Sequence, residues 1–301
     1  MSKTSAIFSV PWPYAYCNTT HREQLMIIEK QAKVNIIRES KIDILHDAYG
    51  RCYQAKALSS FKDYTLLPQL YRYRSPHLLR CLGLNNTDNP DVESLCDLRT
   101  GILINQMDQI DLKESPAEVV VLFEHLSGLT LRQFSIRTIT AITKEISQLY
   151  EKFFDQILTA LEDFAKLSGV GLWHGDISPD NIMITDRENA VLIDFDKSRT
   201  FLPGYSHILT DDSCNKTISL SGTPGYTSKL ALEEQAELSS SGQKSPDFVH
   251  GADRESLGRS FVAALIKKPG STLTAVDIKS VLAQVQPGFA YKLLSALCAN
   301  V

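Results

Sequence analysis

The pattern of apolar and polar residues changes along the chain. Beyond Leu131, apolar residues recur at intervals of three and four, as they do on the buried face of an amphipathic helix. The longest such face comprises Ile146, Leu149, Tyr150, Phe153, Ile157, Leu161 and Phe164. We expect this helix to end where Gly169 and Gly171 follow, because glycine is a poor helix former.

Before Glu124 the pattern favours strands. The strand-like segments are KVNIIRE at 33–39, KIDILHD at 41–47, RCYQAKA at 51–57 and the strongly apolar EVVVLFEHL at 118–126. Later in the chain, NAVLIDF at 189–195 also predicts a buried strand. Two early segments favour helices instead: HREQLMIIEKQA at 21–32 and, weakened by a proline, SSFKDYTLLPQLYRY at 59–73.

These patterns predict an α+β protein with two lobes. The change from strands to helices marks a lobe boundary near 124–128. We therefore divide the chain into an N-terminal extension at 1–32, a β-rich lobe at 33–124 and an α-helical lobe at 125–301. An acidic insertion at about 84–118 interrupts the first lobe, since it holds eight Asp or Glu residues against one Arg and one Lys.

Composition argues against several classes of function. The formal net charge of −4 does not favour a general nucleic-acid-binding surface. The six cysteines form no CxxC pair, which argues against a zinc knuckle or redox motif and favours reduced thiols. No apolar stretch reaches the roughly 20 residues that span a bilayer, and the N-terminus lacks a convincing signal peptide. We expect a cytoplasmic protein with no nucleic-acid partner and no transmembrane segment.

The segment LWHGDISPDNIMI, residues 172–184, carries candidate catalytic chemistry. Phosphoryl transfer from ATP needs a carboxylate near the acceptor hydroxyl and oxygen ligands for the metal that neutralises the phosphates. Asp176 can orient and deprotonate the hydroxyl, and Asn181 can ligate the metal. Asp194, in LIDFD directly after an apolar run, supplies a second metal ligand. The ordered set predicts a phosphotransferase that uses ATP with Mg²⁺ or Mn²⁺.

This set resembles the catalytic loop and the metal-binding segment of the protein kinase superfamily. YQAKAL is similar to the third-strand lysine segment, which implies that Lys56 holds the α- and β-phosphates. VLFEHLSGLTLRQF resembles the gatekeeper and hinge, with Phe123 as gatekeeper and the backbone of Glu124 and Leu126 bound to adenine. The resemblance implies a two-lobed protein-kinase-like fold, with a kinase N-lobe at 33–124 followed by the hinge and C-lobe.

Two downstream segments resemble protein kinases more than small-molecule kinases of the aminoglycoside type. SGTPGYTSKLAL resembles the end of an activation segment, and ADRESLGRSFVAAL resembles the long buried helix F. Together they are similar to casein kinase one-type and fungal-type kinases. The resemblance implies that Asp253 caps the backbone of the catalytic loop. We expect His174 to be structural and to hold that loop by hydrogen bonds.

The segments expected to bind phosphates depart from the protein kinase pattern. No glycine occurs before Gly50, so the glycine-rich loop is absent. Ser40 and Lys41 are candidates to contact the phosphates through side chains instead. The helix C glutamate is also missing, and Asp63 is the nearest acid that could pair with Lys56.

The catalytic loop and the segment after it depart from the pattern as well. Gly175 replaces the arginine that receives an activation-loop phosphate, so we expect that phosphorylation of 200–223 is not the main switch. Ser178 replaces the lysine that would contact the γ-phosphate, and Asp196 replaces the glycine of Asp-Phe-Gly.

The sequence supports three hypotheses. The leading one is a divergent Ser/Thr protein kinase with a protein substrate and an activating protein or polyanion that orders the N-lobe. The second is a small-molecule or lipid-headgroup kinase, which the HGD tripeptide and Ser178 favour. The third is a pseudokinase scaffold, which the missing glycine-rich loop favours. The divergence is also typical of a bacterial or viral effector kinase that works in a host cytosol.

Overall fold

The computed structural model describes part of the chain, and the statements below concern that part. The described residues are 7–8, 26–30, 42–47, 52–57, 61, 66–67, 70, 73, 75–86, 119–168, 171–201, 222–227 and 246–298. They fall into two compact units. The first unit comprises Met1–Arg74 and Arg80–His125, and the second comprises Ser75–Leu79 and Leu126–Val301. Each unit is described by itself.

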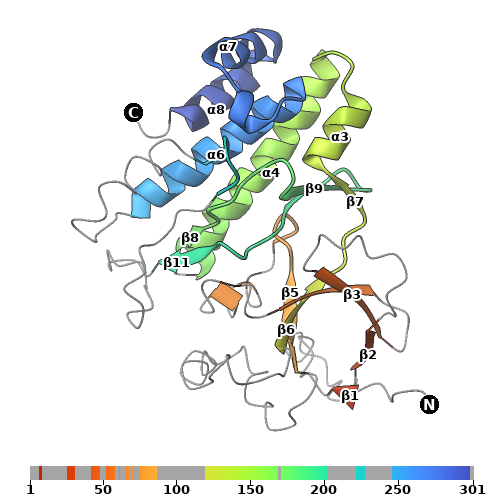
Figure 1. The fold of residues 1–301 in the computed structure, drawn as a ribbon. Coiled ribbons are helices and arrows are strands. Elements are labelled where there is room, and N and C mark those ends of the chain that lie inside the picture. Colours follow the sequence, from red (N-terminus) through yellow and green to blue (C-terminus); the bar gives the residue numbers. More distant parts are fainter. Residues whose placement is uncertain are drawn as a thin grey trace. The chain divides into compact units, whose positions relative to one another are not determined.

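The described strands of the first unit form one antiparallel sheet (Figure 1). Its six strands are β1 (Ile7–Phe8), β2 (Met26–Lys30), β3 (Ile42–Asp47), β4 (Cys52–Ala57), β5 (Cys81–Asn86) and β6 (Val119–Glu124). Their order across the sheet is β1-β2-β3-β4-β6-β5. The strands predicted at 41–47, 51–57 and 118–126 are confirmed as β3, β4 and β6.

The helix predicted at 21–32 is wrong over β2. This strand pairs with β3 in antiparallel register, with Ile28 opposite Asp47. Its apolar residues are consecutive, a pattern that suits a strand as well as a helix, and pairing with a neighbouring strand decides between them. The predicted strand at 33–39 and most of the predicted insertion, 87–118, lie outside the described residues.

Several apolar side chains of the first unit are buried. Phe61 and Phe123 stack with ring centroids 6.0 Å apart. Leu66, Leu67 and Leu70, from the segment predicted to be helical at 59–73, are helical and fully buried. Lys56 is 9% exposed and lies opposite Val121 in the β4–β6 pair. Its backbone lies between Ile42 of β3 and Val121 of β6.

The second unit is mostly helical (Figure 1). Its helices are α3 (Leu131–Thr138), α4 (Lys144–Ser168), α6 (Pro246–Ile266), the 3₁₀ turn η4 (Gly270–Thr272), α7 (Ala275–Gln284) and α8 (Pro287–Leu297). The predicted helix with its apolar face is α4, and it ends at Ser168, just before Gly169. Of its apolar face, Ile146 and Leu149 stay partly exposed and the others are buried. None of the helices in the described ranges is long and apolar enough to cross a membrane.

Aromatic rings hold α4, α6 and α8 together. Phe261 on α6 meets Tyr150 and Phe154 of α4 and Phe289 of α8 edge to face, with centroids 5.3 to 6.4 Å apart. All four rings are buried. Edge-to-face contacts of this kind add to the stabilisation from burial of the rings. Two of the short strands described next, 171–173 and 190–192, contact α4 of this helical core.

Two small sheets of the second unit hold that loop. One has the order β10-β9-β7, formed by β7 (Gly128–Thr130), β9 (Ile182–Thr185) and β10 (Ala190–Leu192). The other pairs β8 (Gly171–Trp173) with β11 (Arg199–Phe201). The predicted strand at 189–195 is thus confirmed for β10. Gly128 permits the close β7–β9 approach, since a Cβ there would lie 2.1 Å from the Ile184 carbonyl oxygen.

Candidate active site

The catalytic loop, defined here as residues 174–181, runs from the end of β8 to the start of β9. Its central residue, Asp176, has a buried side chain. One carboxylate oxygen, Oδ1, accepts hydrogen bonds from the backbone N–H of Thr223 at 2.6 Å and from its hydroxyl at 2.7 Å. The other, Oδ2, accepts from Lys197 Nζ at 2.8 Å and from Asn181 Nδ2 at 3.3 Å. Four donors therefore fix the orientation of this carboxylate.

Asn181 lies beside Asp176 and beside the end of β10. Its side-chain nitrogen donates to the Asp176 carbonyl at 2.8 Å, so the amide oxygen is the atom that can ligate a cation. Its backbone carbonyl accepts from the N–H of Ile193 at 2.9 Å. This bond places Asn181 next to the residue that precedes Asp194. The structure thus brings the two predicted metal ligands to neighbouring backbone positions.

Asp194 adopts a left-handed backbone conformation with φ of 66°. Aspartate tolerates this region better than most residues, and such strain is often found at functional sites. The next residue, Phe195, is buried and packs edge to face on the His174 ring at 5.1 Å. This packing holds the backbone on the C-terminal side of Asp194.

The oxygens of Asn181 and Asp194 suit Mg²⁺ or Mn²⁺. Hard cations prefer carboxylate and amide oxygens, and Mg²⁺ in nucleotide sites usually takes one or two carboxylates together with phosphate oxygens and water. Within the described ranges no group of three or more His, Cys, Asp or Glu side chains could hold a metal by itself. A cation held by Asn181 and Asp194 would take its remaining ligands from phosphate oxygens and water.

His174 and Asp253 hold the backbone of the catalytic loop by hydrogen bonds. The backbone N–H groups of His174 and Gly175 donate to the two carboxylate oxygens of Asp253 at 2.7 and 3.1 Å. His174 Nε2 lies 3.0 Å from the Ile193 carbonyl oxygen, and its Nδ1 accepts from the Asp176 N–H at 3.3 Å. The backbone thus occupies both ring nitrogens, and neither can take a proton from a substrate.

Burial changes the pKa of both supporting groups. Desolvation lowers the pKa of His174, so the ring is neutral, in agreement with its role as donor at one nitrogen and acceptor at the other. Desolvation raises the pKa of Asp253 to about 7, although the two backbone N–H bonds lower it. Gly175, between these groups, has φ of 73°, a conformation that glycine adopts most easily.

Two residues at this site were not among the sequence-based candidates. Lys197 follows the candidate metal ligand Asp194 by three residues. The sequence could have indicated it only as a positively charged residue near that ligand in a chain whose catalytic loop has Ser178 in place of the usual lysine. Thr223 belongs to the GTPGY segment, which the sequence analysis identified without assigning a contact to this threonine. Both donate to Asp176.

The GTPGY segment is attached to the catalytic loop at a second point as well. Arg132, at the start of α3, donates from Nε to both carboxylate oxygens of Asp180 at 2.8 and 2.9 Å. Its Nη2 donates to the hydroxyl of Tyr226 at 3.1 Å. Arg132 thus links Asp180 in the catalytic loop to Tyr226 in the GTPGY segment.

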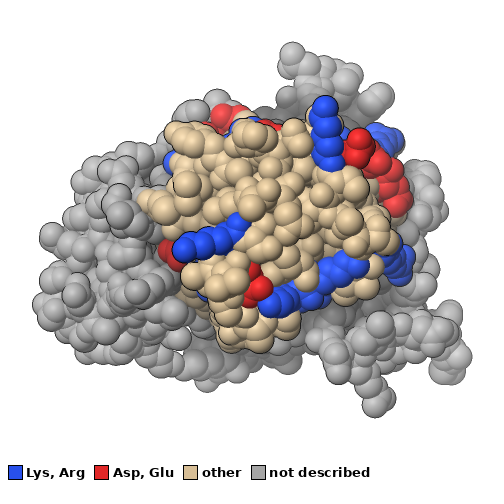
Figure 2. Space-filling view, turned by 90° about the horizontal axis from the view of Figure 1, so that it is seen from above, with Lys and Arg blue, Asp and Glu red and all other residues tan. Residues whose placement is uncertain are grey.

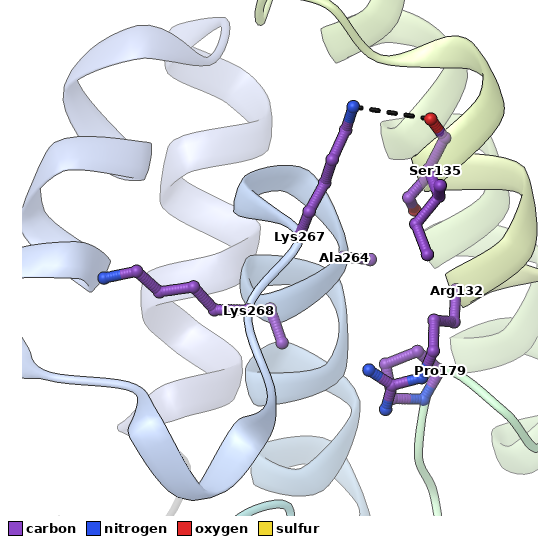
Figure 3. A pocket seen from close by; sticks show the side chains of 8 residues that line it. Arg132, Ser135, Pro179, Ala264, Lys267 and Lys268 are labelled. Atoms are coloured by element: carbon purple, nitrogen blue, oxygen red, sulfur yellow. Dashed lines mark hydrogen bonds between the residues drawn. The ribbon is translucent and has the colours of Figure 1, made fainter.

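A small pocket lies beside this arginine (Figure 3). It is lined by Arg132, Ser135, Ile136, Pro179, Ala263, Ala264, Lys267 and Lys268. Lys267 reaches across it to the Ile136 carbonyl oxygen at 3.5 Å, the dashed contact in Figure 3. The pocket has a volume of about 30 Å³, which holds about two water molecules, so a nucleotide does not fit in it. Figure 2 shows Lys and Arg scattered over the described part of one face rather than gathered in one patch.

The candidate nucleotide-binding residues are divided between the units. Lys56, Phe123 and Glu124 belong to the first, and Leu126 begins the second. The Glu124 N–H donates to the Arg80 carbonyl at 3.1 Å, so an adenine contact would use the Glu124 carbonyl oxygen. The nucleotide-binding roles of these four residues stay predictions.

Three residues proposed to contact the phosphates or Lys56 lie outside the described part of the chain. They are Ser40, Lys41 and Asp63. Residues 202–221, which hold most hydroxyls of the predicted activation loop, also lie outside it.

Comparison with known families supports the reaction class. Residues 117–205, less than a third of the chain, match the model of the phosphotransferase enzyme family (APH). No curated protein matches the chain. The matched segment includes the catalytic loop, both candidate metal ligands and Lys197. This segment is similar to a phosphotransferase domain of the protein-kinase-like superfamily, and the similarity implies ATP-dependent phosphoryl transfer to either a protein or a small molecule.

Proposed function

We propose that this protein is a Ser/Thr protein kinase that transfers the γ-phosphate of ATP to a protein hydroxyl with Mg²⁺ or Mn²⁺. The observation that carries the proposal is the pair of hydrogen bonds from Thr223 to Asp176. They bind the GTPGY segment directly to the candidate catalytic carboxylate. A segment held there can present a peptide hydroxyl to Asp176.

The Arg132 contacts support the same proposal. They attach the segment to the loop a second time, four residues beyond Asp176, through Tyr226 and Asp180. Small-molecule kinases of the aminoglycoside type generally lack the GTPGY segment, so neither attachment is expected in them. A casein kinase one-type or fungal-type specificity belongs to the same proposal.

The residues have distinct roles in the proposed reaction. Asp176 accepts a hydrogen bond from the acceptor hydroxyl, orients it and takes its proton as the new P–O bond forms. Lys56 holds the α- and β-phosphates, and Asn181 and Asp194 hold the cation. The bound cation neutralises charge on the phosphates. Asp253 and His174 keep the loop backbone in place, so that Asp176 stays aligned without rearrangement.

The proposal is tested with labelled ATP and either Mg²⁺ or Mn²⁺, in the presence of a cell extract separated into protein and small-molecule fractions. We expect acid-stable label on serine or threonine of proteins, and we expect Asp176→Ala and Asp194→Ala to abolish it. Asp176→Ala should still bind nucleotide. Label confined to the small-molecule fraction would refute the proposal, and so would protein labelling that survives in Asp194→Ala.

A small-molecule kinase is the second candidate, because the matching family includes enzymes with such acceptors. In that case the label would appear in the small-molecule fraction, and Asp194→Ala would abolish it there. A pseudokinase scaffold would bind nucleotide without transferring phosphate to either fraction.

A further inference from the structure

The catalytic loop lacks a cation where protein kinases have one, and a different residue brings a cation to the same carboxylate. Ser178 stands in the lysine position, and its side chain is 1% exposed. It therefore presents no group to a substrate. Lys197, 21 residues from Asp176, places its Nζ 2.8 Å from Asp176 Oδ2.

We propose that Lys197 is the residue that contacts the transferred phosphate and so replaces the missing loop lysine. The inference rests on the phosphotransferase function proposed above. An ammonium has three N–H donors, and the Asp176 bond needs one of them. The same group can therefore contact oxygens of the γ-phosphate while it keeps its bond to Asp176.

The backbone on both sides of Lys197 is anchored to the catalytic loop. On one side, Phe195 packs on the His174 ring. On the other, Ser198 donates its hydroxyl to the His174 carbonyl at 3.1 Å, and β11 begins by pairing with β8, with Arg199 opposite Trp173. A turn joins the two sides, since the Ser198 N–H donates to the Phe195 carbonyl at 3.1 Å. The position of the lysine is thus fixed by contacts that involve neither nucleotide nor metal.

The exposed fractions of the Lys197 and Asp176 side chains suit contact of Lys197 with a substrate. The Lys197 side chain is 36% exposed and that of Asp176 is 8% exposed, so the ammonium is the member that a bound phosphate can reach. An anionic phosphate that approaches the Asp176 carboxylate is repelled by it. A cation held between the two opposes this repulsion, and it stabilises the charge that spreads over the phosphoryl oxygens during transfer.

The proposed transfer forms one bond to the γ-phosphorus and breaks another. The acceptor oxygen forms the new bond to the γ-phosphorus with its own electron pair, and its proton passes to Asp176. The bond from the γ-phosphorus to the bridging oxygen breaks, and its electron pair leaves with ADP. Lys197 keeps its three protons throughout and contributes charge only.

Three variants test the proposal in the intact protein. Lys197→Met removes the charge and keeps the length of the side chain, while Lys197→Arg keeps the charge. Lys292→Met is the matched control, because it breaks another Lys–Asp contact, the 2.6 Å bond from Lys292 of α8 to Asp155 of α4. For Lys197→Met we expect kcat to fall about 10²- to 10³-fold with the KM for ATP changed less than threefold. Lys197→Arg should have a kcat at least tenfold above that of Lys197→Met, and Lys292→Met should keep wild-type kcat.

A second measurement needs no turnover. ADP with aluminium fluoride and Mg²⁺ mimics the phosphoryl group in transit, and ADP with Mg²⁺ lacks it. We expect Lys197→Met to weaken binding of the first at least tenfold and to leave binding of the second unchanged.

The inference is overturned if Lys197→Met keeps kcat within threefold of wild type or exceeds it, as it would if Lys197 only blocked Asp176. Equal weakening of both nucleotide complexes also overturns it, since that is the result of a purely structural role. If the wild type shows no turnover, but Lys197→Met still weakens only the aluminium fluoride complex and not the ADP–Mg²⁺ complex, the proposed function alone is refuted. A wild type that binds neither complex overturns both.

Discussion

Replacement of Asp253 by Asn tests whether the acid beneath the catalytic loop carries a proton near neutral pH. Asp253 is buried on α6, and both of its oxygens accept backbone N–H groups of the loop. Burial raises its pKa to about 7, from 3.8 in an exposed aspartate. The folded protein therefore keeps a proton on Asp253 over a pH range in which the unfolded chain has lost it.

The raised pKa determines the sign of the pH dependence. The contribution of Asp253 to the free energy of unfolding is complete below pH 3.8, falls as the pH rises toward 7, and is constant above that. Over the whole range the loss is roughly 4 kcal/mol, and between pH 5 and 8 it is roughly 2–3 kcal/mol. Asparagine does not titrate and keeps one acceptor oxygen, so Asp253→Asn loses one backbone bond at every pH, at a cost of about 1–3 kcal/mol.

We therefore expect the free energy of unfolding of the wild type, relative to that of Asp253→Asn, to fall by roughly 2–3 kcal/mol between pH 5 and pH 8. Urea unfolding followed by tryptophan fluorescence measures it, because Trp173 is buried next to the loop. A Trp12→Phe background removes the other tryptophan of the chain. A relative free energy that stays constant or grows from pH 5 to 8 would refute the reasoning and show that Asp253 is ionised throughout.

Asp277→Asn is the control with the opposite behaviour. Hydrogen bonds from Lys268 and Thr274 lower the pKa of Asp277 to about 2. Its contribution is present above pH 3.8 and is lost only as the pH falls toward 2. The difference between the wild type and this variant should therefore be flat from pH 5 to 8.

Three further predictions concern the aromatic core, the GTPGY segment and the hydroxyls of residues 200–221. Phe261→Ala should lower the free energy of unfolding by about 3–5 kcal/mol in urea titrations, because the ring is fully buried among three others. Gly225→Ala should lower both the urea midpoint and kcat, since φ is 85° and the new Cβ would lie 2.0 Å from the Ser271 nitrogen; an unchanged kcat would show that the GTPGY segment does not position Asp176. Replacement of every Ser and Thr in 200–221 should leave kinase activity unchanged, because Gly175 stands where an arginine would receive a phosphate, and strict dependence on one hydroxyl would contradict this.

The fold was predictable where one local pattern decided the element. The α4 helix has seven apolar residues at helical spacing and a glycine just beyond its last residue, so periodicity and end signal agree. The apolar run in β6 is similarly unambiguous. In contrast, β2 contains MIIEK, which has no alternation, and only its pairing with β3 makes it a strand. That pairing joins residues 15 to 19 positions apart, so the local pattern of β2 by itself does not reveal it.

In the candidate site, too, local sequence spacing predicted some residues, and long-range contacts placed others. The positions of Asp176, Asn181 and Asp194 were predictable because the first two lie in one loop and the short β9–β10 hairpin separates that loop from Asp194, so the spacing is visible in the sequence. Thr223 lies 47 residues from Asp176, and its contact depends on the whole path of the intervening chain.

The proposed role of Lys197, in place of the loop lysine that Ser178 replaces, agrees with what phosphoryl transfer requires. Phosphoryl transfer needs a positive charge at a place in space near the acceptor oxygen, and it does not specify which backbone position supplies it. Lysine carries its charge at the end of a flexible four-carbon stem, so more than one backbone position near the carboxylate can supply that charge. The segment after Asp194 must pass beside the catalytic loop, because Phe195 and Ser198 are both held against His174. Lys197 lies between them in the sequence and donates to Asp176, so the serine in the loop is no argument against catalysis.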